Sequence, residues 1–152
     1  MNHTIDEPYQ IERRLAAGGM AEVFVAKRMG PHGFEKRVAL KRILPQFAID
    51  ADFVHMFIDE ARLAARLSHA NIVSVHDFGK LADGRFFLAM EFAEGERLDA
   101  VLRKVGQFPI PRALHVLAQL SDAAEHAHAT GVVHRDLKPE NLILVERRAR
   151  RG

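Results

Sequence analysis

The sequence predicts an α+β fold, in which strands occupy the first part of the chain and helices the second. Short runs rich in β-branched and aromatic residues recur between turn-forming residues, at positions 9–11, 23–26, 38–44, 72–78 and 85–95. Residues 52–67 repeat apolar side chains at helical spacing, and two further helical segments follow at 98–104 and 111–129. This order indicates a region built on a sheet and then a helical region.

The predicted strands differ in their surroundings. The run at 38–44 is apolar and ends before Pro45, as expected of a central strand. The run at 85–95 reads as a buried strand that passes into an extended linker. Near the end of the run at 72–78, Asp77 and Gly79 predict a turn at the strand end.

The helix predicted at residues 52–67 has one apolar face, formed by Phe53, Phe57, Ala61, Ala64 and Leu67. Glu60 lies beside this face. In the last helix, Pro111 in the first turn and Gly131 just past the end fit the usual start and stop signals.

The segment His134–Asn141, with the sequence HRDLKPEN, places three kinds of chemistry within eight residues. An aspartate can accept a proton, a lysine can neutralise phosphate charge, and an asparagine oxygen suits Mg²⁺, which is a hard cation. The alternative is a polar turn after a helix, but many positions of this segment agree with one catalytic signature, which disfavours a simple turn.

This segment resembles the catalytic loop of Hanks-type bacterial serine/threonine protein kinases. The resemblance implies that Asp136 is the catalytic base, that Lys138 contacts the γ-phosphate, and that Asn141 is a metal ligand for Mg²⁺. A lysine two positions after the aspartate further implies that the acceptor is a Ser or Thr hydroxyl of a protein substrate.

Residues 15–23, with the sequence LAAGGMAEV, resemble the glycine-rich loop that covers the phosphates of ATP. The family pattern GxGxxGxV keeps only its middle glycine here, because Ala16 and Ala21 replace the outer two. Alanine restricts the backbone, so we expect weaker nucleotide contact. A simple hairpin is the alternative for this segment alone. The implied ATP contacts are Leu15, Ala16, Ala17, Gly18, Gly19, Met20, Ala21 and Val23.

The segment VALK, residues 38–41, resembles the strand whose lysine binds the α- and β-phosphates. The resemblance implies that Lys41 has this role and that Glu60 holds it in an ion pair. A solvated strand lysine and an ordinary surface glutamate are the alternatives.

The linker after residue 90 resembles the kinase hinge, where backbone groups hold adenine. The implied adenine contacts are Met90 at the back of the pocket, Glu91 as backbone acceptor, Ala93 as backbone donor, and Val23, Ala39 and Ile143 as apolar walls. Each of these residues would serve equally well in a core.

The resemblance implies a protein-kinase-like fold with ATP and Mg²⁺ as cofactors. Residues 1–92 would form an N-lobe with an antiparallel five-stranded sheet and one large helix, residues 93–145 a partial C-lobe, and residues 146–152 a basic tail. The DFG and APE motifs and the activation loop of the family do not follow the catalytic loop. We therefore expect Leu114, Leu117 and Leu120 of the last helix to be exposed.

Three functions remain open at this point. The chain can be a serine/threonine kinase that is completed by further residues or by a complementary C-lobe. It can be a catalytically inactive nucleotide-binding fragment that docks on an intact kinase. It can also be a remnant without function, for which we expect aggregation.

The composition favours a globular cytoplasmic protein, because 48% hydrophobic and 28% charged residues can supply a core and a solvated surface. No apolar run is long enough for a membrane span, and the first ten residues lack the pattern of a signal peptide. Cysteine is absent, and His126 and His128 point in different directions on a helix, so we expect no zinc site. The basic tail lacks interleaved aromatic residues, so we expect no nucleic-acid partner.

Overall fold

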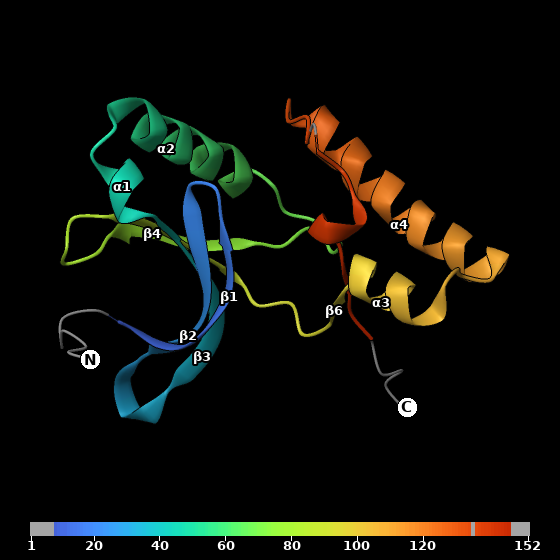
Figure 1. Ribbon diagram of the computed structural model, residues 1–152, viewed down its shortest axis with the longest axis horizontal. Helices are drawn as coiled ribbons and strands as arrows, with labels where there is room; N and C mark the ends of the chain where they lie inside the picture. The colour runs from blue at the N-terminus through green and yellow to red at the C-terminus, as the bar shows by residue number, and fades with distance from the viewer. Residues whose placement is uncertain (1–7, 135, 147–152) are drawn as a thin grey trace. The chain divides into compact units, whose positions relative to one another are not determined.

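The computed structural model describes residues 8–134 and 136–146, so most of the basic tail lies outside the described residues. The chain forms two compact units (Figure 1). The first contains the residues up to Ser68 together with Val73–Phe92, and the second contains His69–Ile72 and the residues from Ala93 onward.

The first unit is built on a five-stranded sheet with the strand order β1-β2-β3-β5-β4, in which every neighbouring pair is antiparallel. This confirms the predicted sheet and its one large helix. The elements are β1 (Tyr9–Gly18), β2 (Ala21–Met29), η1 (Pro31–Gly33), β3 (Glu35–Ile43), α1 (Pro45–Ala48), α2 (Ala51–Ala65), β4 (Val75–Lys80) and β5 (Phe86–Glu91).

Helix α2 packs on one face of this sheet through the apolar stripe that its sequence predicts. Phe57 and Ala61 are buried in one cluster with Ile43 of β3 and Leu88 of β5. At the N-terminus of the helix, the side chain of Asp50 accepts a hydrogen bond from the backbone N–H of Asp52, which caps the first turn. Burial of the stripe therefore fixes which side of α2 faces the sheet.

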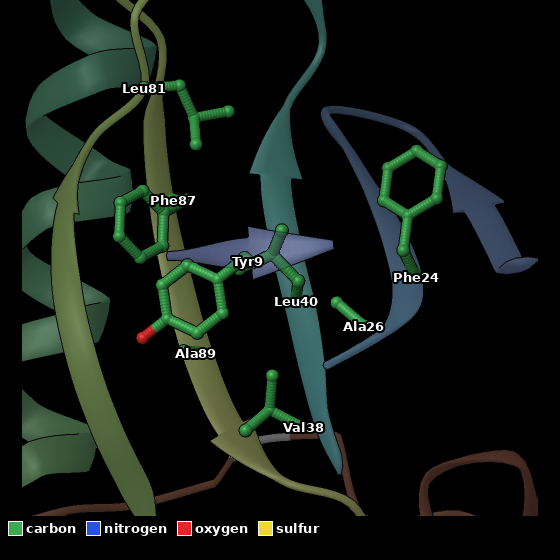
Figure 2. Close-up of a cluster of buried hydrophobic side chains, with 8 residues drawn as sticks. All are labelled: Tyr9, Phe24, Ala26, Val38, Leu40, Leu81, Phe87 and Ala89. Atoms are coloured by element: carbon green, nitrogen blue, oxygen red, sulfur yellow. The ribbon is translucent and has the colours of Figure 1, made fainter. Parts of the chain in front are cut away.

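A second cluster of buried side chains lies on the other face of β3, because successive side chains of a strand alternate between its faces. Val38 and Leu40 belong to this cluster, whereas Ile43 belongs to the one beneath α2. Figure 2 shows its members: Tyr9, Phe24, Ala26, Val38, Leu40, Leu81, Phe87 and Ala89.

Tyr9 connects the first strand of the chain to β4. Its hydroxyl donates a hydrogen bond to Asp77 Oδ2 at 2.7 Å, and its ring lies edge-on to Phe87 at 5.3 Å. Burial, together with this bond to a carboxylate, raises the pKa of the Tyr9 hydroxyl well above its usual range. The predicted strand-end turn is wrong here, since Asp77 lies inside β4, just after a register shift that follows Val75.

The second unit consists of β6 (Glu96–Arg97), α3 (Leu98–Val105), α4 (Ile110–Ala129), η2 (Pro139–Asn141) and β7 (Ile143–Leu144), with β6 and β7 paired antiparallel. Both predicted helices are present. His69–Ile72, although inside the range expected for the N-lobe, joins this unit through contacts with α4. His69 Nε2 lies 3.1 Å from Asp122 Oδ2, and Asn71 Nδ2 donates to Gln119 Oε1 at 3.3 Å.

One side of α4 carries exposed apolar residues. Ile110 is 76% exposed, Leu114 60% and Leu117 55%, whereas Leu120 is half-buried. The predicted exposure is thus confirmed for two of the three leucines. Among the helices of the described residues, none combines the length and apolar character that a bilayer span requires.

Candidate active site

The first unit contains a cavity of about 370 Å³ between the β1–β2 hairpin, β3 and α2. Eight residues predicted from the sequence line it: Ala16, Gly18, Gly19, Met20, Ala21, Val23, Lys41 and Glu60. Four lining residues were not predicted as site residues: Ile43, Phe53, Met56 and Phe57. The sequence could have indicated these four residues as part of the site. Ile43 shares a strand face with Lys41, and the other three lie on α2, along or next to its apolar stripe.

The hairpin at the mouth of this cavity closes tightly. Gly18 pairs with Ala21, which leaves Gly19 and Met20 as the connection. The carbonyl of Met20 accepts a hydrogen bond from the N–H of Leu44 at 2.9 Å, so the hairpin tip is tied to the end of β3.

The backbone conformation of the hairpin does not require glycine. Neither Gly18 nor Gly19 has a positive φ, and a Cβ at either position would meet nothing within 4 Å. Ala16 and Ala21 likewise lie in strands with ordinary φ. The alanines therefore fit the hairpin as it stands, which removes the conformational reason for expecting weaker nucleotide contact.

Lys41 lies near the C-terminal end of β3, opposite Val23 on one side and Leu88 on the other. Its side chain is half-buried and lines the cavity. The structure shows no ion pair between Lys41 and any carboxylate of the described residues. Within this part of the chain, Lys41 thus presents to the cavity a partly desolvated cation without a counter-ion, which is an arrangement that favours an anionic ligand.

Glu60 lines the same cavity, but the expected ion pair with Lys41 is not formed in this structure. The packing of α2 gives the reason. Phe57 and Ala61 take the buried positions against the sheet, and Glu60 is exposed. Residues one position apart on a helix point in different directions, so burial of Ala61 leaves Glu60 at the edge of the buried stripe, where it is exposed and lines the cavity.

Of the residues predicted to contact adenine, Val23 lines the cavity, whereas Ala39, Met90 and Glu91 of the first unit lie outside its lining. Met90 packs against the cluster beneath α2, and Ala39 lies opposite it on β3. The N–H of Glu91 donates to Ser74 O at 2.8 Å, and Glu91 Oε2 accepts from the N–H of Ser74 at 3.2 Å. Neither bond uses the carbonyl of Glu91, which is its predicted contact. Leu15 and Ala17 are exposed on the hairpin.

In the second unit, the three residues of the predicted catalytic loop come together around Asp136. Asn141 Nδ2 donates to Asp136 O at 2.8 Å and lies 3.4 Å from its Oδ2, and Lys138 Nζ also lies 3.4 Å from Oδ2. The N–H of Asp136 donates to His134 Nδ1 at 3.1 Å. The Asp136 side chain is 64% exposed, so its carboxylate remains open to an incoming hydroxyl. Arg135 lies outside the described residues.

A short ladder anchors the end of this loop. Glu96 pairs with Leu144 and Arg97 with Ile143, and the N–H of Leu98 donates to Leu142 O at 2.8 Å. At Gly95 a Cβ would lie only 2.0 Å from Leu144 O, so no larger residue fits without a shift of the backbone.

Gly95 was not predicted as a site residue, because the requirement comes from a strand about 50 residues away. Two predicted adenine contacts lie in this ladder or next to it. Ala93 is half-buried and precedes it, and Ile143 is 44% exposed within it.

The described residues do not form a complete Mg²⁺ site. Asn141 Nδ2 donates to Asp136, which leaves Asn141 Oδ1 as one oxygen ligand, while the Asp136 carboxylate is engaged by Lys138. In the part of the chain that the structure describes, no group of three or more His, Asp or Glu side chains could hold a metal ion. Mg²⁺ usually takes one or two carboxylates in addition to phosphate oxygens.

A sequence profile for the protein kinase domain matches residues 9–150. The chain is 44% identical over 149 residues to the tyrosine-protein kinase MasK of Myxococcus xanthus, covering 90% of this chain and 23% of MasK. It is 40% identical over 147 residues to the serine/threonine-protein kinase PknA of Mycobacterium tuberculosis, covering 93% of this chain and 33% of PknA. With PknH of the same organism it is 40% identical over 137 residues, covering 90% of this chain and 21% of PknH.

The fold also matches a solved structure, that of a point mutant of the kinase domain of Mycobacterium tuberculosis PknI. The TM-score is 0.72 at 32% sequence identity, and the match covers 92% of this chain and 56% of that one. The chain therefore spans 21–33% of the length of the three relatives compared by sequence, and just over half of the solved kinase domain.

Proposed function

The chain belongs to the protein kinase domain family, and on that basis we propose that it acts in ATP-dependent phosphoryl transfer to Ser or Thr hydroxyls of protein substrates. One observation carries the proposal. Lys41 presents a half-buried cation, without an ion-pair partner among the described residues, to a cavity walled by the hairpin of residues 15–23.

Lys41 and the hairpin would bind the phosphates of ATP. The cavity brings the ammonium group of Lys41 together with the backbone of Gly18 and Gly19, where no side chain obstructs a close approach. Backbone N–H groups and a lysine are the usual means of holding a polyphosphate in this family. The contacts of Met90, Glu91, Ala93 and Ile143 with adenine remain predictions.

Asp136 would accept the proton of the acceptor hydroxyl. Lys138 and Asn141 both contact this residue, so the carboxylate is oriented before a substrate arrives. Lys138, whose side chain is 49% exposed, would contact the γ-phosphate. Mg²⁺ supplies charge neutralisation of the phosphates in kinases, and Asn141 Oδ1 is the oxygen that this chain would offer to it.

The acceptor class rests on Lys138 and on the relatives. PknA and PknH are serine/threonine-protein kinases, whereas MasK is a tyrosine-protein kinase. Lysine two residues after the catalytic aspartate favours an alcohol over a phenol. ATP and protein substrates are also consistent with the cytoplasmic location predicted from the sequence, which remains a prediction.

A second candidate is a nucleotide-binding protein without catalytic activity, and the exposed apolar side of α4 favours it. In this case the exposed side of α4, with Ile110, Leu114 and Leu117, would dock on a complementary C-lobe or on an intact kinase. A remnant without function predicts an aggregated chain that binds no ATP.

Transfer of the γ-phosphate from labelled ATP tests the first candidate. The full chain is incubated with Mg²⁺, a generic protein substrate and peptides that contain only Ser, only Thr or only Tyr. We expect label on Ser or Thr, loss of labelling in Asp136→Asn, and no change in Glu140→Gln, which alters a carboxylate of the same loop. A folded, monodisperse chain that binds ATP without transferring phosphate would instead support the second candidate, and label on Tyr alone would overturn the acceptor class.

A further inference from the structure

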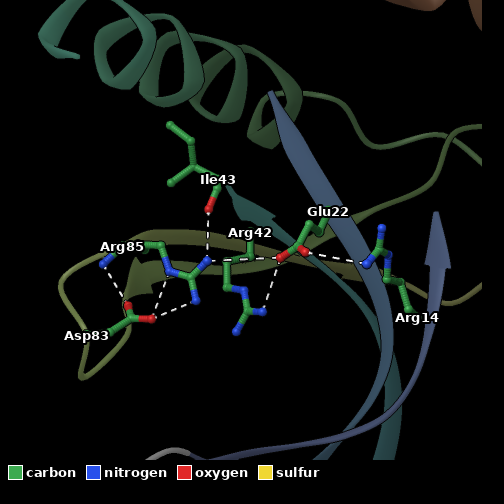
Figure 3. A network of polar contacts seen from close by, with 6 residues as sticks. All are labelled: Arg14, Glu22, Arg42, Ile43, Asp83 and Arg85. Atoms are coloured by element: carbon green, nitrogen blue, oxygen red, sulfur yellow. Dashed lines mark hydrogen bonds and ion pairs between the residues drawn. The ribbon is translucent and has the colours of Figure 1, made fainter. Parts of the chain in front are cut away.

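Glu22 of β2 lies at the centre of a network of charged side chains (Figure 3). Its carboxylate faces guanidinium groups from three other segments: Arg42 of β3 at 3.1 Å, Arg14 of β1 at 3.9 Å, and Arg85, just before β5, at 4.0 Å. The side chains of Glu22 and Arg85 are 15% exposed and that of Arg42 is 20% exposed. These charges are therefore much less screened than those of an ordinary surface ion pair.

Glu22 is the only carboxylate in the described part of the chain that forms an ion pair with Arg42. Asp83 is occupied by Arg85, with two contacts of 2.8 Å, and Arg85 also donates to the carbonyl of Ile43 at 3.4 Å. Arg42 lies over the ring of Phe24 at 4.7 Å, and its buried Nε has no hydrogen-bond partner among the described residues. Loss of Glu22 would leave Arg42 as a largely buried charge without compensation, which is strongly unfavourable.

The network lies directly behind the residues of the cavity. Glu22 stands between Ala21 and Val23, and Arg42 stands between Lys41 and Ile43; all four of these neighbours line the cavity. Glu22 and Arg42 are opposite each other in the β2–β3 register, next to the pair formed by Val23 and Lys41. Because strand side chains alternate between faces, an ion pair on one face sets the register that places Val23 and Lys41 together on the other.

We infer that Glu22 is a positioning residue, whose ion pair with Arg42 holds the phosphate-binding hairpin in register with the strand that carries Lys41. The inference rests on the proposed nucleotide-binding role of Lys41. Glu22 contacts no predicted ligand atom itself and acts through the strands that it joins.

The chain offers a matched control in Glu12. This carboxylate also joins neighbouring strands of the same sheet, with Lys27 Nζ at 3.3 Å and Arg37 Nε at 3.1 Å, and it is 24% exposed. None of these three residues lines the cavity. Glu22→Gln and Glu12→Gln therefore make the same chemical change in the same sheet, and only Glu22 adjoins the site.

Two readouts separate a positioning role from general stability. The first is amide hydrogen exchange of residues 15–24 in the full chain without nucleotide, and the second is the Kd for ATP from titration calorimetry. We expect Glu22→Gln to speed exchange of residues 15–24 about fivefold and to weaken ATP binding roughly tenfold, the factor that corresponds to one lost hydrogen bond between charged groups. Glu12→Gln is expected to leave both values unchanged.

A conservative variant completes the test. Glu22→Asp keeps a carboxylate facing Arg42, Arg14 and Arg85 and is expected to retain slow exchange and ATP affinity, even if Glu22→Gln alone does not fold. Equal effects of Glu22→Gln and Glu12→Gln on residues 15–24, or fast exchange and weak ATP binding in Glu22→Asp, would overturn the inference. If the wild-type chain binds no ATP, the proposed function fails, while the exchange comparison still decides the role of Glu22.

Discussion

Gly95 allows a direct test of how the catalytic loop is anchored. A Cβ at this position would lie 2.0 Å from Leu144 O, and contacts under 3.0 Å are essentially never seen, so Gly95→Ala must push the β7 backbone away by at least the difference. The displaced groups are those of the β6–β7 ladder, which includes the hydrogen bond of 2.8 Å from Leu98 N–H to Leu142 O. Loss of two such bonds costs about 2 kcal/mol in the free energy of unfolding.

For a chain of this size, that loss lowers Tm by about 4–8 °C. The measurement is thermal unfolding followed by circular dichroism, with Gly19→Ala as the control, since a Cβ there meets nothing within 4 Å and the backbone has no positive φ. Because Ile143 lies in the displaced strand, Gly95→Ala should also weaken ATP binding. Equal Tm values for the two variants would show that β7 does not constrain Gly95.

Three further variants test separate parts of the structure. Tyr9→Phe keeps the ring but removes its hydrogen bond to Asp77, and should lower the free energy of unfolding in urea by about 1–2 kcal/mol. Because the pKa of Tyr9 is raised in the folded state, this advantage of the wild type should hold below the usual tyrosine pKa of about 10. It should decline as the pH rises above that value. Leu117→Gln, on the exposed side of α4, should leave stability unchanged and reduce self-association in sedimentation velocity. Equal sedimentation profiles of this variant and the wild type would show that the exposed side of α4 does not drive self-association. Replacing Ala16 and Ala21 together by Gly should change the Kd for ATP by less than about twofold, whereas much tighter binding would indicate that the nucleotide-bound hairpin adopts a positive φ.

Local pattern was enough to predict most of the fold. The spacing of Phe53, Phe57 and Ala61 predicted α2 and its buried side, and the apolar run at 38–44 predicted the central strand β3. The runs predicted for β1 and β2 were shorter than the observed strands, because the charged residues that extend both strands have low β-propensity.

Contacts between distant residues were not predictable from local pattern. Tyr9 and Asp77 are 68 positions apart, and their hydrogen bond places Asp77 within a strand where composition suggested a turn. The position of Glu60 depends on how α2 rotates to bury Ala61, and the need for glycine at 95 depends on the path of β7. Eight of the residues predicted from the motifs therefore line one cavity, whereas the ion pair expected between Lys41 and Glu60 was not found.

Titration calorimetry of the full chain with ATP measures whether Lys41 binds the phosphates. Lys41→Met should weaken binding by at least about tenfold, because a charge-assisted contact with phosphate is lost. Lys36→Met is the control, since Lys36 is an exposed lysine of the same strand outside the cavity. Equal affinities of the two variants, or no binding by a folded wild-type chain, would show that Lys41 does not bind the phosphates of ATP.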